Sequence, residues 1–339
     1  MSNYLVTGVA GFIGARVAEK LLEDGNFVWG CDDLNDAYDV RMKLWRLDQL
    51  KQVANNQLAV PNQPNFIFRR IDISDFDALM KSDFFRNGQP IAFDAVINLA
   101  ARAGVRQSVE NPWIYIATNQ IGTLNLLELC RHYKISKFIL ASTSSVYGAN
   151  PPLPTPEEAN SDFPLQPYAA SKKGAETLCH AYHFLYGIDV TIFRYFTVYG
   201  PAGRPDMSMF RFVQWINEGR PVIVNGDGEQ SRGFTFIDDI AQGTILGLKP
   251  LGFEIINLGG HEVIKINDLI KQFETRIGKK AQIEHLPAHP ADMLTNWADV
   301  NKAKTLLNWK PQIDLQAGTK RLVDWYIAER SWVSQIETS

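Results

Sequence analysis

A glycine-rich turn near the N-terminus constrains the fold of this chain more than any other feature. Gly8, Gly11 and Gly14 follow the apolar stretch Tyr4-Leu5-Val6-Thr7 with the spacing G-x-x-G-x-x-G, and a segment with helical periodicity comes after them. Glycines at these positions allow a tight turn, close approach of the backbone to a pyrophosphate, and close packing of helix on strand. We therefore expect a dinucleotide-binding turn with the phosphates at the helix N-terminus.

Two acidic residues follow the second predicted strand. The apolar run Phe27-Val28-Trp29-Gly30-Cys31 ends at Asp32 and Asp33. In dinucleotide-binding folds an acid at about this distance from the glycine turn binds the hydroxyls of the adenine ribose. Because two carboxylates should repel a 2'-phosphate, the sequence favours NAD over NADP as the cofactor.

Apolar strands and helix-like segments alternate through the first 199 residues. Further strands are expected at 66–68, 95–99, 138–141 and 190–194, and acidic, small or hydroxyl residues follow several of them. This alternation predicts an α/β fold, a Rossmann doubly wound parallel sheet whose ligand lies across the carboxyl ends of the strands.

The predicted domains are interleaved in the sequence. The alternation loosens beyond residue 199, but an apolar run at 254–258 is expected to rejoin the sheet. We therefore predict a NAD-binding Rossmann domain over 1–199 and a smaller α/β substrate-binding lobe over 200–253 and 259–339.

Two local patterns leave smaller expectations. Between residues 35 and 58, Leu44, Leu47, Leu50 and Val53 recur with the period of an amphipathic helix. Asp72 follows a predicted strand, where it could contact a ligand or serve as an N-cap for the next helix.

Composition excludes several classes of protein. The 339 residues carry 34 Lys+Arg and 37 Asp+Glu, a formal net charge of −3, so no overall field attracts nucleic acid or an anionic membrane. No apolar run is long enough to span a membrane, and because strand-like residues begin at Tyr4 we expect no signal peptide. The three cysteines are odd in number, far apart and without metal-ligand spacing. We expect a cytoplasmic protein with reduced thiols and no metal site.

The chemistry of the chain centres on Tyr168 and Lys172. They stand four residues apart at the start of a helix-like segment, so both side chains share one face. A nearby ammonium group favours the phenolate and lowers the pKa of the phenol, which would let Tyr168 act as a general base towards a substrate hydroxyl. Four hydroxyl residues, 142–145, end the strand at 138–141 and would face the same ligand.

As a set, the glycine turn, Asp32, Thr143 and the Tyr168/Lys172 pair resemble the extended short-chain dehydrogenase/reductase family over essentially the whole chain. The resemblance implies an NAD cofactor. It also implies that Tyr168 is the catalytic acid/base, that Lys172 lowers its pKa and holds the nicotinamide ribose, and that Thr143 hydrogen-bonds the reacting oxygen. The cofactor-binding residues expected on this basis are Gly8, Gly11, Phe12, Ile13, Gly14, Asp32, Asp33, Asn35, Asp72, Ile73, Leu99, Ala100, Ala101, Asn119, Tyr168, Lys172, Tyr195 and Val198.

Within this family the chain is similar to nucleotide-sugar 4-epimerases, most closely to those that act on UDP-glucuronate. The segments 34–47, 100–106 and 197–207 carry the likeness. It implies that Arg204 binds the sugar carboxylate, with Arg106 as the competing choice, and that Arg232 binds the nucleotide diphosphate, although a surface salt bridge is its other reading. The expected substrate-binding residues are Thr143, Ser144, Ser145, Thr197, Arg204 and Arg232.

Four positions depart from the family pattern. The family usually has Asn at the position of Asp33, His at Asn98, Asp at Gly233 and an aromatic residue near Asn225. The last two bear on the nucleotide site.

The expected reaction is a reversible 4-epimerisation of a UDP-hexuronic acid through a 4-keto intermediate. UDP-glucuronate decarboxylation is the nearest alternative, but related decarboxylases and dehydratases carry a carboxylate just after the position of Thr143, where this chain has Ser144 and Ser145. UDP-galactose 4-epimerisation is disfavoured by Arg204, and a non-catalytic NAD-binding regulator should lack part of the hydroxyl, Tyr and Lys set. The resemblance also implies a homodimer paired through helices near 119–133 and 168–186.

Overall fold

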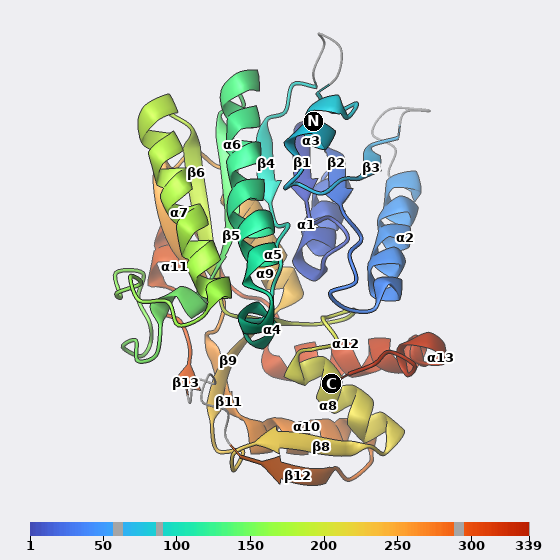
Figure 1. The fold of residues 1–339 in the computed structure, drawn as a ribbon. Helices are drawn as coiled ribbons and strands as arrows, with labels where there is room; N and C mark the ends of the chain where they lie inside the picture. The colour runs from blue at the N-terminus through green and yellow to red at the C-terminus, as the bar shows by residue number, and fades with distance from the viewer. Residues whose placement is uncertain (57–63, 86–90, 288–294, 339) are drawn as a thin grey trace.

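The computed structural model describes residues 1–56, 64–85, 91–287 and 295–338, and its largest element is a seven-stranded sheet (Figure 1). All neighbouring strands in this sheet are parallel. In spatial order they are β10 (Phe253–Leu258), β6 (Asp189–Tyr195), β5 (Lys137–Thr143), β4 (Ala95–Asn98), β1 (Asn3–Thr7), β2 (Phe27–Asp32) and β3 (Phe66–Arg70). The predicted Rossmann-type α/β fold is confirmed.

Helices cover both faces of the large sheet, with a separate apolar core on each face. One face packs against α1 (Phe12–Glu23), α2 (Val40–Asn56), α9 (Ile237–Leu246) and α11 (Asn301–Leu307). The other packs against α3 (Phe76–Lys81), α6 (Gly122–Tyr133) and α7 (Pro167–Tyr186). Helices α9 and α11 therefore pack on the large sheet although the chain enters them after residue 199.

The predicted helix after residue 35 exists, but its buried face is displaced. Leu44 is 44% exposed, whereas Lys43 and Arg46 are buried beside Leu47 and Leu50. The expectation for Leu44 was wrong because two buried cations, and not an apolar row alone, set the orientation of α2: Lys43 pairs with Asp32 at the cavity wall, and Arg46 donates to the carbonyls of Ala10 and Ala202. Residue 58, where the pattern ended, lies outside the described residues.

A smaller lobe lies beyond the carboxyl ends of the large sheet (Figure 1). Its strands are β7 (Thr197–Tyr199), β9 (Ser231–Phe236), β11 (Glu262–Lys265) and β13 (Thr295–Asn296) in one sheet, and β8 (Pro221–Asn225) with β12 (Gln282–Leu286) in another. A third apolar core joins β7, β8, β9 and β11 to α8 (Ser208–Glu218), α10 (Ile266–Ile277), α12 (Leu315–Ala328) and α13 (Arg330–Val333).

Short helical segments complete the rim between the lobes. They are α4 (Val105–Glu110), α5 (Pro112–Tyr115), the π-helix Ile116–Ile121 and the 3₁₀ helix Ser144–Tyr147. Because parallel strands end at one edge, the residues after β1 to β6 meet along a single line that faces the smaller lobe.

Candidate active site

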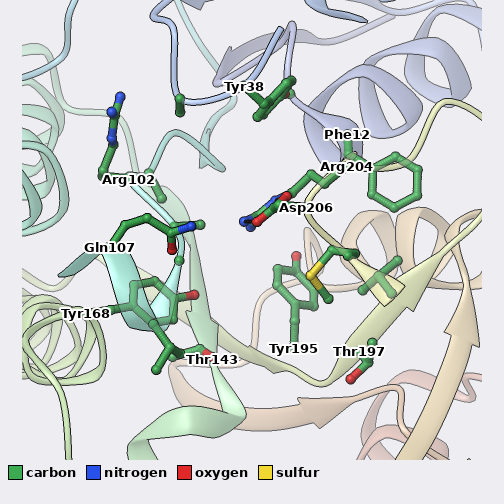
Figure 2. Close-up of a pocket in the computed structure, with 18 of the residues that line it drawn as sticks. Phe12, Tyr38, Arg102, Gln107, Thr143, Tyr168, Tyr195, Thr197, Arg204 and Asp206 are labelled. Atoms are coloured by element: carbon green, nitrogen blue, oxygen red, sulfur yellow. Dashed lines mark hydrogen bonds and ion pairs between the residues drawn. The ribbon is translucent and has the colours of Figure 1, made fainter. Parts of the chain in front are cut away.

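One large cavity of about 1240 Å³ lies between the carboxyl edge of the large sheet and the smaller lobe (Figure 2). Its wall includes most of the residues expected from the sequence. From the cofactor set it contains Gly8, Gly11, Phe12, Ile13, Gly14, Asp32, Asp33, Asn35, Asp72, Ile73, Leu99, Ala100, Ala101, Tyr168, Lys172, Tyr195 and Val198. From the substrate set it contains Thr143, Ser144, Ser145, Thr197, Arg204 and Arg232.

The glycine turn is shaped by close backbone packing. Gly8 has φ +65°, and a Cβ placed on it would lie 2.6 Å from the backbone nitrogen of Ala100. A Cβ on Gly14 would lie 2.1 Å from the carbonyl oxygen of Gly8. Helix α1 starts directly after Gly11, with no side-chain cap and no acid in its first turn. Its N-terminus therefore presents a partial positive charge to the cavity and suits an anion.

Asp32 and Asp33 have different surroundings at the end of β2. Asp32 is 7% exposed, accepts a hydrogen bond from the Leu34 backbone N–H (2.9 Å), and lies 3.3 Å from Lys43 Nζ. Burial raises the pKa of Asp32, while Lys43 opposes the shift. Asp33 instead accepts from the backbone and side-chain amides of Asn35. Asp32 is thus the more buried of the two acids, and Lys43, which lies near both, balances part of the paired negative charge.

The structure settles the two readings of Asp72. The N-cap of α3 is Asp75, whose carboxylate accepts from the Ala78 N–H at 2.9 Å. Asp72 accepts from the backbone and hydroxyl of Ser74, both at 2.8 Å, and is exposed at the cavity wall. The capping alternative for Asp72 is therefore wrong.

Asn98 stands at the carboxyl end of β4, behind the cavity wall. Its side chain accepts from the Thr7 hydroxyl at 2.7 Å and donates to the Thr123 hydroxyl at 3.0 Å. Thr7 in turn accepts from the Ala100 N–H at 3.1 Å. An amide side chain can accept one of these hydrogen bonds and donate the other. This explains physically how Asn98 fits a position where the family usually has His.

Thr143, Tyr168 and Lys172 lie together at the centre of the cavity. Thr143 ends β5, Tyr168 lies in the first turn of α7, and the Tyr168 ring points into the cavity beside Thr143 (Figure 2). Burial raises the pKa of the Tyr168 phenol, while a hydrogen bond with Thr143 and the charge of Arg204 lower it. The Lys172 ammonium donates to the Ala141 carbonyl at 2.8 Å.

The lysine is therefore not the main group that acts on the ligand-free phenol. Burial lowers the pKa of Lys172 to about 8, and Glu176, one turn further along α7, opposes that shift. The prediction that Lys172 itself lowers the pKa of Tyr168 remains a prediction for the cofactor-bound protein.

Arg204 faces Tyr168 from the loop that follows β7 (Figure 2). Its Nε and Nη2 donate to the two carboxylate oxygens of Asp206, at 3.0 and 2.5 Å. Burial disfavours the charge of Arg204, but Asp206 more than compensates and raises its pKa. Arg106, the competing choice for the sugar carboxylate, also lines the cavity but is exposed on α4. A protonated guanidinium that can donate two hydrogen bonds thus faces the Tyr168 phenol across the cavity.

The far end of the cavity lies in the smaller lobe. Arg232 on β9 lines it and donates to the Ser231 carbonyl at 3.0 Å. A Cβ on the next residue, Gly233, would lie 2.2 Å from the Gly260 carbonyl oxygen, so the aspartate usual in the family has no room here. Asn225 also lines this end.

Asn119 is the one expected cofactor residue that does not line the cavity. It is 1% exposed in the π-helix, where it donates to and accepts from the backbone of Arg102 and donates to the Ser171 hydroxyl at 2.9 Å. It therefore fixes the loop after β4 against α7, behind the wall.

Several cavity residues were not assigned a role from the sequence. They are Tyr38, Lys43, Arg102, Gln107, Met207, Arg211, Phe212 and Trp215. Most of them lie inside or beside the segments 34–47, 100–106 and 197–207, which are similar to those of nucleotide-sugar 4-epimerases. The segments as a whole therefore pointed to the cavity, although no single one of these positions did. Trp215 and Phe212, on α8, supply apolar faces near Asn225 where the family has an aromatic residue.

Within the described ranges no group of three or more His, Cys, Asp or Glu side chains could hold a metal ion. In the same ranges no helix is long and apolar enough to cross a membrane.

A parallel sheet with a glycine turn, an acid at the end of its second strand and a hydroxyl, Tyr and Lys set at its carboxyl edge defines a dinucleotide-binding α/β protein. The model of the GDP-mannose 4,6 dehydratase family matches residues 5–322, and the chain belongs to this family of extended short-chain dehydrogenases/reductases.

Individual relatives show which members of this family the chain is similar to. The chain is 56% identical to a UDP-glucuronate 4-epimerase of Thermodesulfobacterium geofontis over 326 residues, which cover 96% of both chains. It matches the crystal structure of the UDP-glucuronic acid 4-epimerase from Bacillus cereus in complex with UDP-glucuronic acid and NAD with a TM-score of 0.85, at 36% identity over 96% of this chain and 99% of that one. It also matches the UDP-glucose 4-epimerase of Thermotoga maritima with UDP-glucose, with a TM-score of 0.84 at 30% identity over 97% and 99% of the two chains.

Proposed function

We propose that this protein is an NAD-dependent UDP-glucuronate 4-epimerase that interconverts UDP-glucuronate and UDP-galacturonate. The observation that carries the proposal is the pairing of Arg204 with Tyr168 in one cavity. A guanidinium whose charge already acts on the Tyr168 phenol is placed to bind a C6 carboxylate while the phenol acts on the neighbouring 4-hydroxyl. The similarity to UDP-glucuronate 4-epimerases supports the same substrate.

The residues of this chain fit NAD. The turn at Gly8, Gly11 and Gly14 leaves no space for side chains and opens onto the N-terminus of α1, where a pyrophosphate would bind. Asp32 stands at the strand end where the adenine ribose would be held. Lys172, at the other end of this wall, is the residue that would hold the nicotinamide ribose. When bound, NAD⁺ accepts a hydride from C4 of the sugar and returns it, so the overall reaction is redox-neutral.

Tyr168 moves the proton. As a phenolate it takes the proton of the sugar 4-hydroxyl. After the 4-keto sugar has rotated so that the opposite face of C4 is turned to the cofactor site, Tyr168 gives the proton back to the same oxygen. Thr143 donates a hydrogen bond to that oxygen and, with Arg204, favours the phenolate against the effect of burial. Arg204 anchors the carboxylate, and Arg232 binds the diphosphate about which the sugar rotates.

The test is the product formed from UDP-glucuronate with NAD⁺. We expect UDP-galacturonate, and the same final mixture when the reaction starts from UDP-galacturonate. Formation of UDP-pentose alone would make the protein a decarboxylase, and turnover of UDP-galactose in preference to UDP-glucuronate would make it a neutral-sugar epimerase. Each of these results contradicts the proposal.

We also propose a homodimer that pairs through α6 and α7. Apolar side chains stand exposed in the last turn of α7, where Phe184 is 80% and Leu185 62% exposed, and on α5, where Trp113 is 80% exposed. Exposed apolar side chains that gather on one face are typical of a protein interface. Sedimentation of the protein and of Phe184→Glu tests it: a monomeric parent protein contradicts the proposal. The three buried free cysteines support a cytoplasmic location, which cell fractionation tests.

A further inference from the structure

Arg46 joins two parts of the cavity that are remote in sequence. This α2 side chain is 3% exposed, and its Nη1 donates to the carbonyl of Ala10, inside the glycine turn, at 3.0 Å. Its Nε and Nη2 both donate to the carbonyl of Ala202, at 3.1 and 2.7 Å. Ala202 lies two residues before Arg204. A single planar group thus connects the proposed pyrophosphate turn with the loop that carries the proposed carboxylate ligand.

The loop is strained at the residue that Arg46 holds. Ala202 has φ +52°, in the left-handed region, which residues with a Cβ rarely adopt. It is 4% exposed, and its carbonyl receives both hydrogen bonds from Arg46. A conformation of this kind persists only where its surroundings enforce it. The position of the Arg204 backbone therefore depends on Arg46.

The charge of Arg46 is not neutralised by its hydrogen-bond partners. Besides Ala10 and Ala202, these are the Tyr38 phenol at 2.8 Å and the Gly203 carbonyl at 3.5 Å. The rings of Tyr38 and Phe12 lie 5.5 and 6.0 Å from its guanidinium carbon. All of these groups are uncharged. A buried cation held only by neutral oxygens is stabilised further when an anion arrives nearby, as a pyrophosphate would at the turn.

We propose that Arg46 is a positioning residue that couples cofactor binding to substrate binding. Occupation of the glycine turn strengthens the hold of Arg46 on Ala202 and so fixes Arg204 in the geometry that receives the sugar carboxylate. Coupling of this kind is reciprocal, so substrate must also tighten the binding of cofactor by the same factor. The inference rests on the proposed function, because it takes NAD and a UDP-hexuronic acid as the two ligands.

The test measures the coupling directly, with full-length protein carrying Tyr168→Phe so that the ternary complex does not react. Isothermal titration calorimetry gives the Kd of UDP-glucuronate without NAD⁺ and with saturating NAD⁺. In this parent we expect NAD⁺ to lower the Kd by about 5- to 150-fold. With Arg46→Met added, the ratio should fall to about 1. Arg46→Lys keeps the charge but cannot hold both carbonyls, and we expect it to lose most of the coupling while remaining folded.

Two further variants separate coupling from simple support of the loop. Glycine adopts positive φ without strain, so Ala202→Gly added to Arg46→Met should restore much of the affinity for UDP-glucuronate alone, but not its dependence on NAD⁺. Arg41→Met is the matched control, because Arg41 lies on the same helix and pairs with Asp39 and Gln335 and not with the loop. It should leave the ratio unchanged.

An unchanged ratio in both Arg46 variants, with weaker binding of each ligand separately, overturns the proposal and leaves Arg46 a purely structural residue. A ratio of 1 in the parent also overturns it. Failure of the parent to bind UDP-glucuronate at all contradicts the proposed function instead, and the same proteins titrated with UDP-galacturonate, which carries the same carboxylate, then decide whether Arg46 couples the two sites.

Discussion

The phenol and the guanidinium that face each other across the cavity are held in different ways. Behind Thr143 and Tyr168, Glu176 on α7 accepts from the Ser142 hydroxyl at 2.5 Å and from Arg194 on β6 at 2.8 Å, and all three of these side chains are at most 4% exposed. On the other side, Arg204 forms an ion pair with Asp206, and both side chains are about a quarter exposed, at 26% and 29%.

This difference separates chemistry from recognition. A buried, fully bonded network fixes groups that must stay within hydrogen-bond reach of a reacting oxygen. A partly exposed ion pair costs less to rearrange than a buried one, so Arg204 can exchange its bond to Asp206 for one to a ligand carboxylate. The wall around Tyr168 should therefore be sensitive in rate and stability, and the wall around Arg204 chiefly in substrate affinity.

Replacing Tyr168 should have the largest effect on rate. Tyr168→Phe removes the group that carries the proton, and we expect kcat to fall by about 10²- to 10⁴-fold, the usual contribution of a general acid/base. The measurement is the rate of UDP-galacturonate formation under saturating substrate. The affinity for UDP, measured by titration, serves as the control and should change little. Near-normal turnover would remove Tyr168 from the mechanism.

Breaking the buried pair behind Tyr168 should have the largest effect on stability. Glu176→Gln leaves Arg194 without its charged partner, so we expect the free energy of unfolding to fall by about 3–5 kcal/mol. The double variant Glu176→Gln/Arg194→Met removes both charges and should lose clearly less, as measured by urea denaturation. Equal losses in the single and double variants would mean that the pair is not what holds this wall together.

Replacing Arg204 should act on affinity and on pH dependence. Arg204→Met should lower kcat/KM for UDP-glucuronate by about 10- to 150-fold, the value of a hydrogen bond to a charged group. Arg204 lowers the pKa of Tyr168, so its loss raises that pKa and the part of the rate profile that rises with pH should move to higher pH. Arg106→Met is the comparison: a larger loss there would assign the carboxylate to Arg106.

The smallest effect is expected at Asp206. Asp206→Asn removes the charge of an accessible ion pair, which should change the free energy of unfolding by about 0–1 kcal/mol. Arg204 would then lose the partner that competes with substrate, so KM for UDP-glucuronate should not rise by more than a few-fold. A large loss of stability, read from the same urea denaturation curves, would show that this wall is as rigid as the one around Tyr168.

The sequence predicted the reactive wall better than the connections behind it. Each of the main site residues stands at a position that the sequence pattern itself marks: Gly8 in a turn, Asp32 and Thr143 at strand ends, and Tyr168 at a helix start. The parallel topology of the sheet then brings these positions to one edge. Leu44 was expected on the buried face of its helix because it fits the apolar periodicity. That periodicity cannot show that buried cations occupy the same face. For Asp72, the sequence alone could not show that Asp75, three residues further on, caps the helix instead.

Contacts between remote residues had no local signal at all. Arg46 and Ala202 are 156 positions apart, and the left-handed conformation of Ala202 is not encoded by a glycine or asparagine. The family resemblance implied that Asn119 binds the cofactor, but its side-chain amide already donates to the Arg102 carbonyl and to the Ser171 hydroxyl. The boundary between lobes near residue 199 remains a prediction, since α9 and α11 pack on the large sheet.

The outer strand β10 is made late in synthesis. β6 ends at Tyr195, whereas its neighbour at the sheet edge, β10, begins only at Phe253. Chains fold from the N-terminus as they emerge from the ribosome. The backbone N–H and C=O groups on the outer side of β6 therefore stay unpaired while the start of the smaller lobe is translated. An open edge is where nascent chains pair with one another. The interleaved order of the lobes thus sets an interval during production in which crowded polysomes favour aggregation, and slower initiation or a chaperone should raise the yield of soluble protein.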